Sequence, residues 1–260
     1  MNIVMFVSGR NRNLLSCLEV QDNYPELLSI SLVVSDNLTN EAIETARLRG
    51  IPVISRDFAA ACGSWRASRS DPQLAEQYWR AAVSFHDGML EEILAFERCN
   101  AKFDLAVLSY HHWIHGKLLE YFFNRMINQH SGDLSVLKPD GSRCYIGVNP
   151  VLTALRNGEK RTRSSTFLVT EGHDAGEILC QGPWVEFRDT EVTHATTFAH
   201  EQIQKIESDG PSVRFALREI ALGRFGIADE QIHPQGRRVL TYDGQALPYA
   251  GVDLSKSFDQ

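Results

Sequence analysis

Short apolar runs alternate with helix-like stretches along the first half of the chain, and this alternation constrains the fold more than any other feature. The runs lie at residues 3–7, 29–34, 52–54 and 104–108. They are apolar throughout instead of at every second residue, which is typical of strands that a parallel sheet buries on both faces. The sequence therefore predicts an α/β fold: a Rossmann-like, mostly parallel sheet with helices on both faces.

The stretches between these runs have helical spacing. Residues 13–20 and 40–49 each fit a helix, and Gly50 is placed to end the second one. Residues 57–100 are long for one crossover connection, so we predict a helical insertion or elaboration there. It contains two helix-like stretches, residues 71–80 and 88–96.

The last part of the chain is a helical region followed by a polar tail. Residues 191–222 predict a helix that breaks near Pro211. After Gly223 the chain becomes polar and loses its periodicity. We predict a catalytic domain over residues 1–222 and, over residues 223–260, a C-terminal extension without regular structure that packs on the surface of this domain.

Charge and cysteine content limit the partners and the compartment. The net charge of −7 provides no general attraction to nucleic acid or to an anionic membrane, so we expect neither partner. No apolar run approaches the ~20 residues of a membrane span, and the N-terminal run lacks the features of a signal peptide. Five scattered cysteines form no Cys-x-x-Cys pair, which favours buried free thiols in a reducing cytoplasm.

Three polar side chains in the middle of the chain suit acyl transfer to an amine. Asn128 and His130 are two residues apart, so on an extended segment their side chains point to the same side. Asp174 lies in a glycine-flanked turn between residues 167–169 and 178–181, which predict a hairpin. An amide, an imidazole and a carboxylate can stabilise an oxyanion, move a proton and set the charge of the imidazole.

In their order along the chain, these segments resemble the folate-dependent formyltransferase family. The segment Asn2-Ile-Val-Met-Phe-Val-Ser-Gly9 resembles the family's first strand and phosphate loop, and Asn128-Gln-His130 resembles its Asn-x-His motif. Residues 147–159 and the turn Glu171-Gly-His-Asp-Ala-Gly176 follow the second half of the family pattern. The resemblance covers roughly residues 1–222 and implies the formyltransferase fold.

The resemblance implies an enzyme that moves a formyl group from 10-formyltetrahydrofolate to an amine. Asn128 and His130 would stabilise the oxyanion, while Asp174 would favour the protonated imidazole and help to pass a proton through water. The donor-binding residues that it implies are Leu108, Trp113, Ile114, His115, Thr170, Glu171 and Gly172. The acceptor-binding residues that it implies are Gly9, Arg10, Asn11, Arg12, Asn13 and Ser131. No metal is implied, and a homodimer stays open.

Departures from the family pattern surround the expected acceptor site. The first loop, Gly9-Arg-Asn-Arg-Asn13, has arginines where glycines let backbone amides approach a phosphate. Ser131-Gly132 follows the imidazole where the family often has proline, and residues 133–145 are longer and more polar. The segment Tyr110-His-His-Trp113 replaces a more apolar turn. We therefore expect a small amine acceptor other than glycinamide ribonucleotide: an amino sugar, a nucleotide or a peptide-like metabolite.

Other functions stay open at this stage. Hydrolysis of 10-formyltetrahydrofolate is one, although the family's hydrolases carry an N-terminal regulatory domain and this chain begins at the first strand. A divergent glycinamide ribonucleotide formyltransferase is another. A non-catalytic folate-binding module is disfavoured by the three polar side chains. The residues after Gly223 are too few and too weakly basic for a domain that grips tRNA.

Two further clusters have plainer interpretations. A group of three histidines lacks a neighbouring carboxylate or cysteine that would complete a metal site, so we expect none at His111, His112 and His115. A group of three cations follows a helix end, where positive charge favours the helix dipole. We interpret it as a solvated turn formed by Lys160, Arg161 and Arg163.

Overall fold

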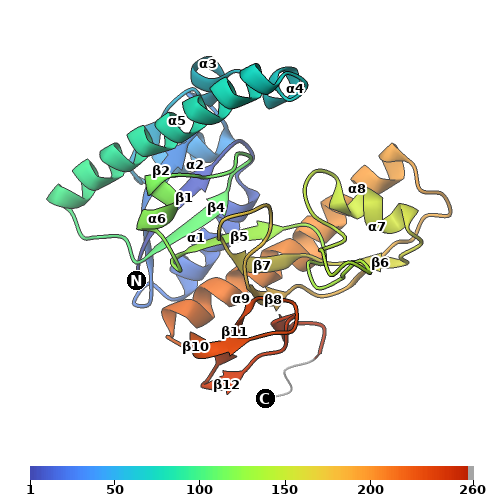
Figure 1. The fold of residues 1–260 in the computed structure, drawn as a ribbon. Coiled ribbons are helices and arrows are strands. Elements are labelled where there is room, and N and C mark those ends of the chain that lie inside the picture. The colour runs from blue at the N-terminus through green and yellow to red at the C-terminus, as the bar shows by residue number, and fades with distance from the viewer. Residues whose placement is uncertain (257–260) are drawn as a thin grey trace. The chain divides into compact units, whose positions relative to one another are not determined.

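The computed structural model describes residues 1–256 (Figure 1). The chain divides into two compact units. The first unit contains residues 1–14 and 29–126, and the second contains residues 15–28 and the chain from residue 127 onward. No helix within residues 1–256 combines the length and the apolar character that crossing a bilayer requires.

Parallel strands form the centre of the first unit. β1, Asn2–Val7, lies between β2 and β4, and β3 lies beyond β2, with all three pairings parallel. The side chains of residues 3–7 are fully buried, which accounts for the uninterrupted apolar run in the sequence. The other strands of this unit are β2 Ser29–Ser35, β3 Val53–Ser55 and β4 Leu105–Ser109.

The first helices begin and end close to where the sequence predicts them. α2, Glu41–Leu48, begins after Asn40, whose side chain accepts a hydrogen bond from the Ile43 N–H at 2.9 Å. Gly50 follows its end in a left-handed conformation with a φ of 68°, which glycine adopts at little cost. Two more helices bracket this part of the chain: α1 Arg12–Asn23 and α6 Lys117–Tyr121.

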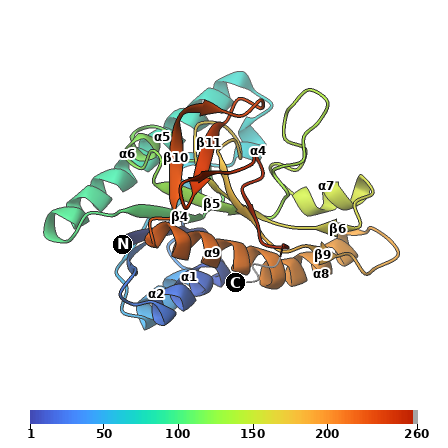
Figure 2. The same cartoon turned by 90° about the horizontal axis from the view of Figure 1, so that it is seen from below.

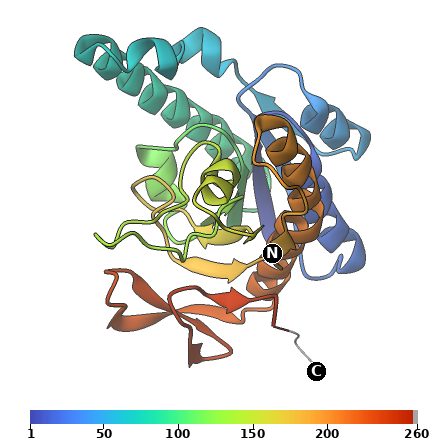
Figure 3. The same ribbon diagram turned by 90° about the vertical axis from the view of Figure 1, so that its right-hand side faces the viewer.

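Residues 57–100 are mostly helical, but the two predicted stretches are one long helix (Figures 1 and 3). α5 runs without a break from Pro72 to Cys99, because buried side chains recur at helical spacing through residues 82–93. Gly88 does not interrupt it. A side chain at this position would meet the Arg56 guanidinium, whose Cζ would lie 3.2 Å from the added Cβ. Two short helices precede α5: α3 Phe58–Cys62 and α4 Trp65–Ser68.

The second unit contains a mixed set of strands. β5, Met126–His130, pairs antiparallel with β7, Ser165–Leu168, which pairs antiparallel with β8, Ile178–Gln181. The β7–β8 pairing is the predicted hairpin. Near the end of the described chain, β13, Val252–Asp253, adds to β8 as a parallel strand. A separate short ladder consists of β6 Arg161–Thr162 and β9 Val185–Glu186.

The predicted break in the C-terminal helical region is a π-helical segment. α8, His194–Gln204, continues through the π segment Lys205–Asp209 into α9, Gly210–Ala221 (Figure 2). Pro211 has no N–H to donate to the preceding turn, so regular α-helical bonding cannot continue through it. A further helix of this unit is α7, Pro150–Arg156.

The expectation of an irregular tail after Gly223 was wrong. An antiparallel three-stranded sheet forms there, drawn in red in Figures 2 and 3. The pairing register shifts between Ile227 and Ile232, where Glu230 has a φ of 58°. Side chains therefore do not alternate regularly between the two faces of the first strand, and the sequence shows no strand pattern there. The strands are β10 Phe225–Ile232, β11 Arg238–Tyr242 and β12 Gln245–Ala246.

The cysteines are free, but they are not all buried. Cys17, Cys62 and Cys180 are buried as expected, whereas Cys144 is partly exposed and Cys99 is exposed near the end of α5.

Candidate active site

β5 places two of the predicted catalytic residues on one side of a strand. Asn128 and His130 alternate with Gln129, whose side chain lies on the other side of the strand, near Asp209. Asp209 is buried, and this burial raises its pKa to about 7. The pairing with β7 sets His130 opposite Ser165. The extended geometry expected for the Asn-Gln-His segment is therefore present.

The His130 ring lies between a backbone carbonyl and a carboxylate. Its Nε2 is 2.8 Å from the Tyr145 carbonyl oxygen, and its Nδ1 is 3.7 Å from Oδ2 of Asp174. A carbonyl can only accept, so Nε2 carries a proton and donates it to Tyr145. Nδ1 is therefore the ring nitrogen that is placed to exchange a proton, and it faces Asp174.

The turn that carries Asp174 is held by groups from a distant loop. Oδ2 of Asp174 accepts the Gly147 N–H at 2.9 Å and lies 3.4 Å from Nε2 of His173. The Arg143 guanidinium donates to the carbonyl oxygens of Asp174 and Gly176. Sequence reasoning missed Arg143, and the only signal for it was the unusually polar stretch of residues 133–145.

Burial and a neighbouring carboxylate act in opposite directions on the charge of His130. Burial lowers the pKa of His130 below its ordinary value, and this effect outweighs the opposite effect of Asp174. Asp174 raises the pKa of His130 and so favours the protonated ring, as expected, but the burial of the ring, which the sequence does not show, has the larger effect. The imidazole is therefore neutral near pH 7, so it can accept a proton.

With this geometry established, sequence comparison identifies the family. The model of the formyl transferase family matches residues 1–206, most of the 260-residue chain. The chain belongs to the formyl transferase family. The match confirms the predicted enzyme class, a folate-dependent formyltransferase. It also confirms the predicted donor, because homologous formyltransferases use 10-formyltetrahydrofolate.

Solved structures of similar fold include formyltransferases and a deformylase. Phosphoribosylglycinamide formyltransferase from Coxiella burnetii is 20% identical, with a TM-score of 0.68 and coverage of 97% of this chain and 98% of that chain. Glycinamide ribonucleotide transformylase 1 from Symbiobacterium toebii is 23% identical, with a TM-score of 0.67 and 92% of each chain covered. A formyltetrahydrofolate deformylase from Pseudomonas syringae pv. tomato is 18% identical, with a TM-score of 0.63 and coverage of 93% and 66%.

At these identities the likeness concerns the fold alone, and it confirms the predicted α/β fold with a mostly parallel central sheet and helices. No sequence among curated proteins matches the chain.

The residues predicted to bind the donor of this formyl transferase lie in both units. In the first unit, Leu108 and Ile114 are buried near the end of β4, and Trp113 is 43% exposed. The Trp113 ring stacks on Trp79 of α5, with ring centroids 5.6 Å apart, and His115 meets the same ring edge-on at 5.1 Å. The helical region 57–100 thus contacts the predicted donor segment of its own unit.

In the second unit, the predicted donor residues belong to the turn that carries Asp174. Thr170 is partly buried, whereas Glu171 and Gly172 are exposed. Gly172 has a φ of 100°, a conformation that favours glycine. The assignment of all these residues to donor binding stays a prediction.

The predicted acceptor loop also lies in the first unit. Asn11 donates to the Thr45 hydroxyl at 2.9 Å, and Arg10 is exposed. Arg12 Nη1 is buried and has no hydrogen-bond partner among the described residues. In the second unit, the Ser131 carbonyl accepts a hydrogen bond from Gln204 at 2.7 Å. A role of these residues in acceptor binding stays a prediction.

One of the three clustered histidines has a carboxylate partner that the sequence did not reveal. His112 Nε2 lies 3.2 Å from Oδ2 of Asp36, and its ring stacks on Phe58 with centroids 3.6 Å apart. Asp36 follows a different strand and is far away in sequence. Within residues 1–256, no group of three or more His, Cys, Asp or Glu side chains is arranged to hold a metal ion.

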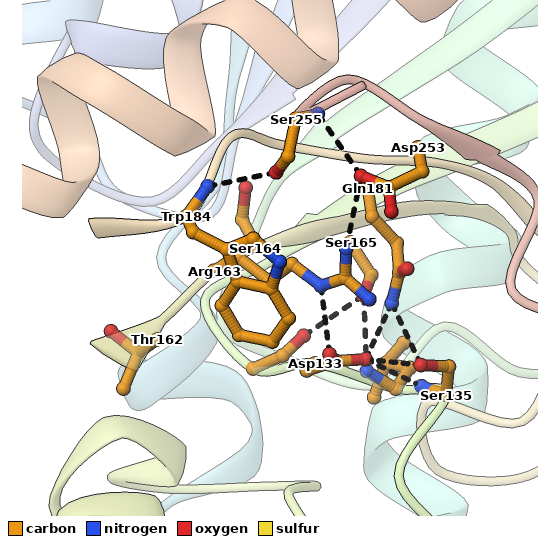
Figure 4. A network of polar contacts seen from close by, with 12 residues as sticks. Asp133, Ser135, Thr162, Arg163, Ser164, Ser165, Gln181, Trp184, Asp253 and Ser255 are labelled. Atoms are coloured by element: carbon orange, nitrogen blue, oxygen red, sulfur yellow. Dashed lines mark hydrogen bonds and ion pairs between the residues drawn. The ribbon is translucent and has the colours of Figure 1, made fainter. Parts of the chain in front are cut away.

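The interpretation of the basic cluster as a solvated turn was wrong for one of its members. Lys160 and Arg161 are exposed, but Arg163 is buried, with ion pairs to Asp133 at 2.8 Å and Asp253 at 3.1 Å (Figure 4). Its guanidinium also lies 4.0 Å from the centre of the Trp184 ring. The partners come from distant segments, which is why the local pattern suggested solvent exposure.

A recess lies next to His130 in the second unit. Its volume is about 290 Å³, including the open space at its mouth. Its walls include Ser131 and Gly132, which follow His130 in the chain. They also include Tyr145, whose carbonyl binds the His130 ring. The apolar residues of its remaining walls are Val136, Pro150, Val151, Ala154 and Trp184. The polar and charged ones are Asp133, Glu159, Arg161, Thr162 and Arg163.

Proposed function

We propose that this formyl transferase moves the formyl group of 10-formyltetrahydrofolate to the amine of a small metabolite, such as an amino sugar, a nucleotide or a peptide-like compound. The observation that carries the proposal is the arrangement of His130, a largely buried neutral imidazole with Nε2 bound to a carbonyl and Nδ1 facing Asp174. Asn128 lies two residues earlier on the same side of β5. Catalysis by a neutral base beside a carboxylate fits attack by an amine, which must lose a proton.

The proposed reaction proceeds through a tetrahedral intermediate. The amine nitrogen bonds to the formyl carbon, and the Asn128 amide donates to the oxyanion that forms. His130 accepts the amine proton at Nδ1, and Asp174 stabilises the resulting imidazolium. The bond between the formyl carbon and N10 then breaks, and the proton passes to N10. The products are the formylated amine and tetrahydrofolate.

This role of His130 predicts the pH dependence of the reaction. Because the pKa of His130 is lowered from 6.5, the ring is in its basic form at neutral pH. We expect kcat/KM to be constant around pH 7 and to fall as the pH drops through the lowered pKa, which lies below 6.5. Rate profiles between pH 5 and 8, with an NMR titration of the His130 ring, measure both quantities. An acidic limb centred above pH 7 would contradict the assignment.

The recess beside His130 supports a small acceptor. Gly132 separates the imidazole from α7, because an added Cβ would lie 2.9 Å from Pro150 Cβ and 3.0 Å from His130 Nε2. The backbone can therefore pass close to the ring only with glycine here. The walls combine apolar side chains with Glu159 and Arg161, groups that could contact both the apolar and the polar parts of a small amine.

A panel of amine acceptors tests the proposal. We expect glycinamide ribonucleotide to be a poor substrate, because the first loop carries Arg10 and Arg12 where a phosphate would need close backbone amides. Steady-state assays with amino sugars, amino-bearing nucleotides, amino acids and glycinamide ribonucleotide would identify the acceptor.

Three results of this panel are informative. A kcat/KM for glycinamide ribonucleotide of roughly 10⁴ M⁻¹s⁻¹ or above would make the chain a divergent purine-pathway enzyme. Release of formate at turnover rates with every amine would favour hydrolysis of the donor. Binding of a non-reactive folate analogue, measured by calorimetry, is the independent test of the donor site.

A further inference from the structure

The turn that carries Asp174 has a backbone that needs support from outside. Asp174 has a φ of 47°, in the left-handed region that non-glycine residues rarely adopt. The Leu168 N–H closes the turn by donating to the Glu177 carbonyl at 2.9 Å. The Asp174 side chain faces His130 only while the turn between Leu168 and Glu177 keeps this conformation. That conformation depends on the groups that donate hydrogen bonds to the carbonyl oxygens of the turn.

Arg143 supplies this support from the loop that precedes α7. Its Nη1 donates to the Asp174 carbonyl, and its Nη2 donates to the Gly176 carbonyl at 2.7 Å. The side chain is buried, with a relative exposure of 7%, and both of these acceptors are backbone carbonyl oxygens instead of carboxylates. Burying a guanidinium costs free energy unless its N–H groups are hydrogen-bonded. The groups that accept these hydrogen bonds therefore fix the position of the side chain.

The third acceptor of Arg143 comes from the C-terminal segment. The Arg143 Nε donates to the Tyr249 hydroxyl at 2.9 Å, and the guanidinium lies 5.5 Å from the centre of the Tyr249 ring. Tyr249 in turn packs against the buried cluster of Leu134, Phe167 and Ile178, which joins the two strands next to the turn. The phenol therefore links the Arg143 side chain to the hairpin.

A second contact ties the same segment to the end of the turn. Arg238 of β11 forms a two-point ion pair with Glu177, with Nε and Nη2 each 2.9 Å from a carboxylate oxygen. Glu177 directly follows Gly176, whose carbonyl Arg143 binds. Planar pairs of this kind fix orientation as well as distance.

We propose that Arg143, Tyr249 and Arg238 are positioning residues, through which the C-terminal segment holds the Asp174 turn in the conformation that faces the imidazole. None of the three touches the reacting atoms. The inference rests on the proposed function for its effect on turnover, but the position of the turn can be measured without a reaction.

The Arg143→Met variant is the first test. We expect kcat to fall about tenfold or more, because a displaced Asp174 no longer stabilises the imidazolium. An NMR titration of His130 distinguishes positioning of Asp174 from a role of Arg143 in stability alone. The charged and titratable groups that act on His130 are Asp174, His173 and Arg143, and the hydrogen bond to the Tyr145 carbonyl also raises its pKa. Loss of the Arg143 charge alone raises the pKa of His130, whereas loss of Asp174 from its place lowers it, so a fall shows that the turn has moved.

Two further variants isolate the contacts from the charge. Tyr249→Phe keeps the Arg143 cation and removes one acceptor, and we expect a two- to fivefold loss of kcat with a lowered His130 pKa. Arg143→Lys keeps a cation that can bind one carbonyl, and we expect it to restore part of the activity. Arg238→Gln breaks the second contact, and Arg237→Ala is its matched control because Arg237 is adjacent and has no such pair in the described chain.

The outcomes separate this inference from the proposed function. If the wild-type protein transfers formyl groups, an unchanged kcat in Arg143→Met and Tyr249→Phe would overturn the positioning role and leave the function standing. If the wild-type protein transfers none, the titration still decides: a His130 pKa that rises in Arg143→Met and stays unchanged in Tyr249→Phe would overturn it. Should Arg143→Met fail to fold, Tyr249→Phe and Arg238→Gln provide the same measurements.

Discussion

Replacing His130 by alanine is expected to reduce formyl transfer at least about a hundredfold while the fold stays intact. The variant removes the ring whose Nδ1 faces Asp174 and whose Nε2 binds the Tyr145 carbonyl. Asn128→Ala removes the amide proposed to donate to the oxyanion, and we expect a loss of the same size. Asp174→Ala removes the carboxylate that stabilises the imidazolium, with a similar expected loss.

Combining the three substitutions indicates whether they act together. Groups that serve one step give losses that are far from additive, so a double variant of His130 and Asp174 should be little worse than the His130 variant alone. Asp174→Asn retains an oxygen that can accept the Gly147 N–H and removes only the charge. His194→Ala, which removes an exposed imidazole from the same unit, is the control. Near wild-type turnover in all three alanine variants would show that the catalytic assignment is wrong.

The elements that the sequence predicted well are those whose signal is local. The strand over residues 3–7 is apolar at every position, and the residues around Asn40 and Gly50 mark the ends of one helix by their own capping chemistry. The hairpin around Asp174 follows from two short strands and a glycine-flanked turn. In each case the residues that determine the structure are neighbours in the chain.

The features that escaped prediction depend on contacts between distant segments. Arg163 looked solvated beside a helix end, but Asp133 and Asp253 bury it. For Arg143 the polar stretch of residues 133–145 gave only a weak signal, because its acceptors lie about thirty and a hundred residues away. The lowered pKa of His130 follows from burial, which no local pattern reports. Sequence motifs therefore suggested the groups that we propose to react, while their charge and support depend on packing.

Gly176→Ala is expected to destabilise the protein by about 3 kcal/mol, the largest stability effect among the glycines of the active-site turn. A Cβ at this position would overlap the Leu168 carbonyl oxygen and lie 2.7 Å from the Leu168 carbonyl carbon. Both are backbone atoms of the paired strand, so no side-chain rotation can relieve the overlap. The turn has to move instead, and the Gly176 carbonyl then leaves the Arg143 guanidinium.

Denaturant unfolding of the full-length protein measures this effect, and Gly9→Ala is the matched control. Gly9 has no atom within 4 Å of an added Cβ and does not need a left-handed backbone, so we expect a change within about 0.5 kcal/mol. The activity of Gly176→Ala, measured where it is still folded, should fall as far as that of Asp174→Ala, since both lose the carboxylate from its place. Equal stability of the two glycine variants would mean that the hairpin can widen at residue 176, and the close fit of the Asp174 turn would then not be what holds the carboxylate against His130.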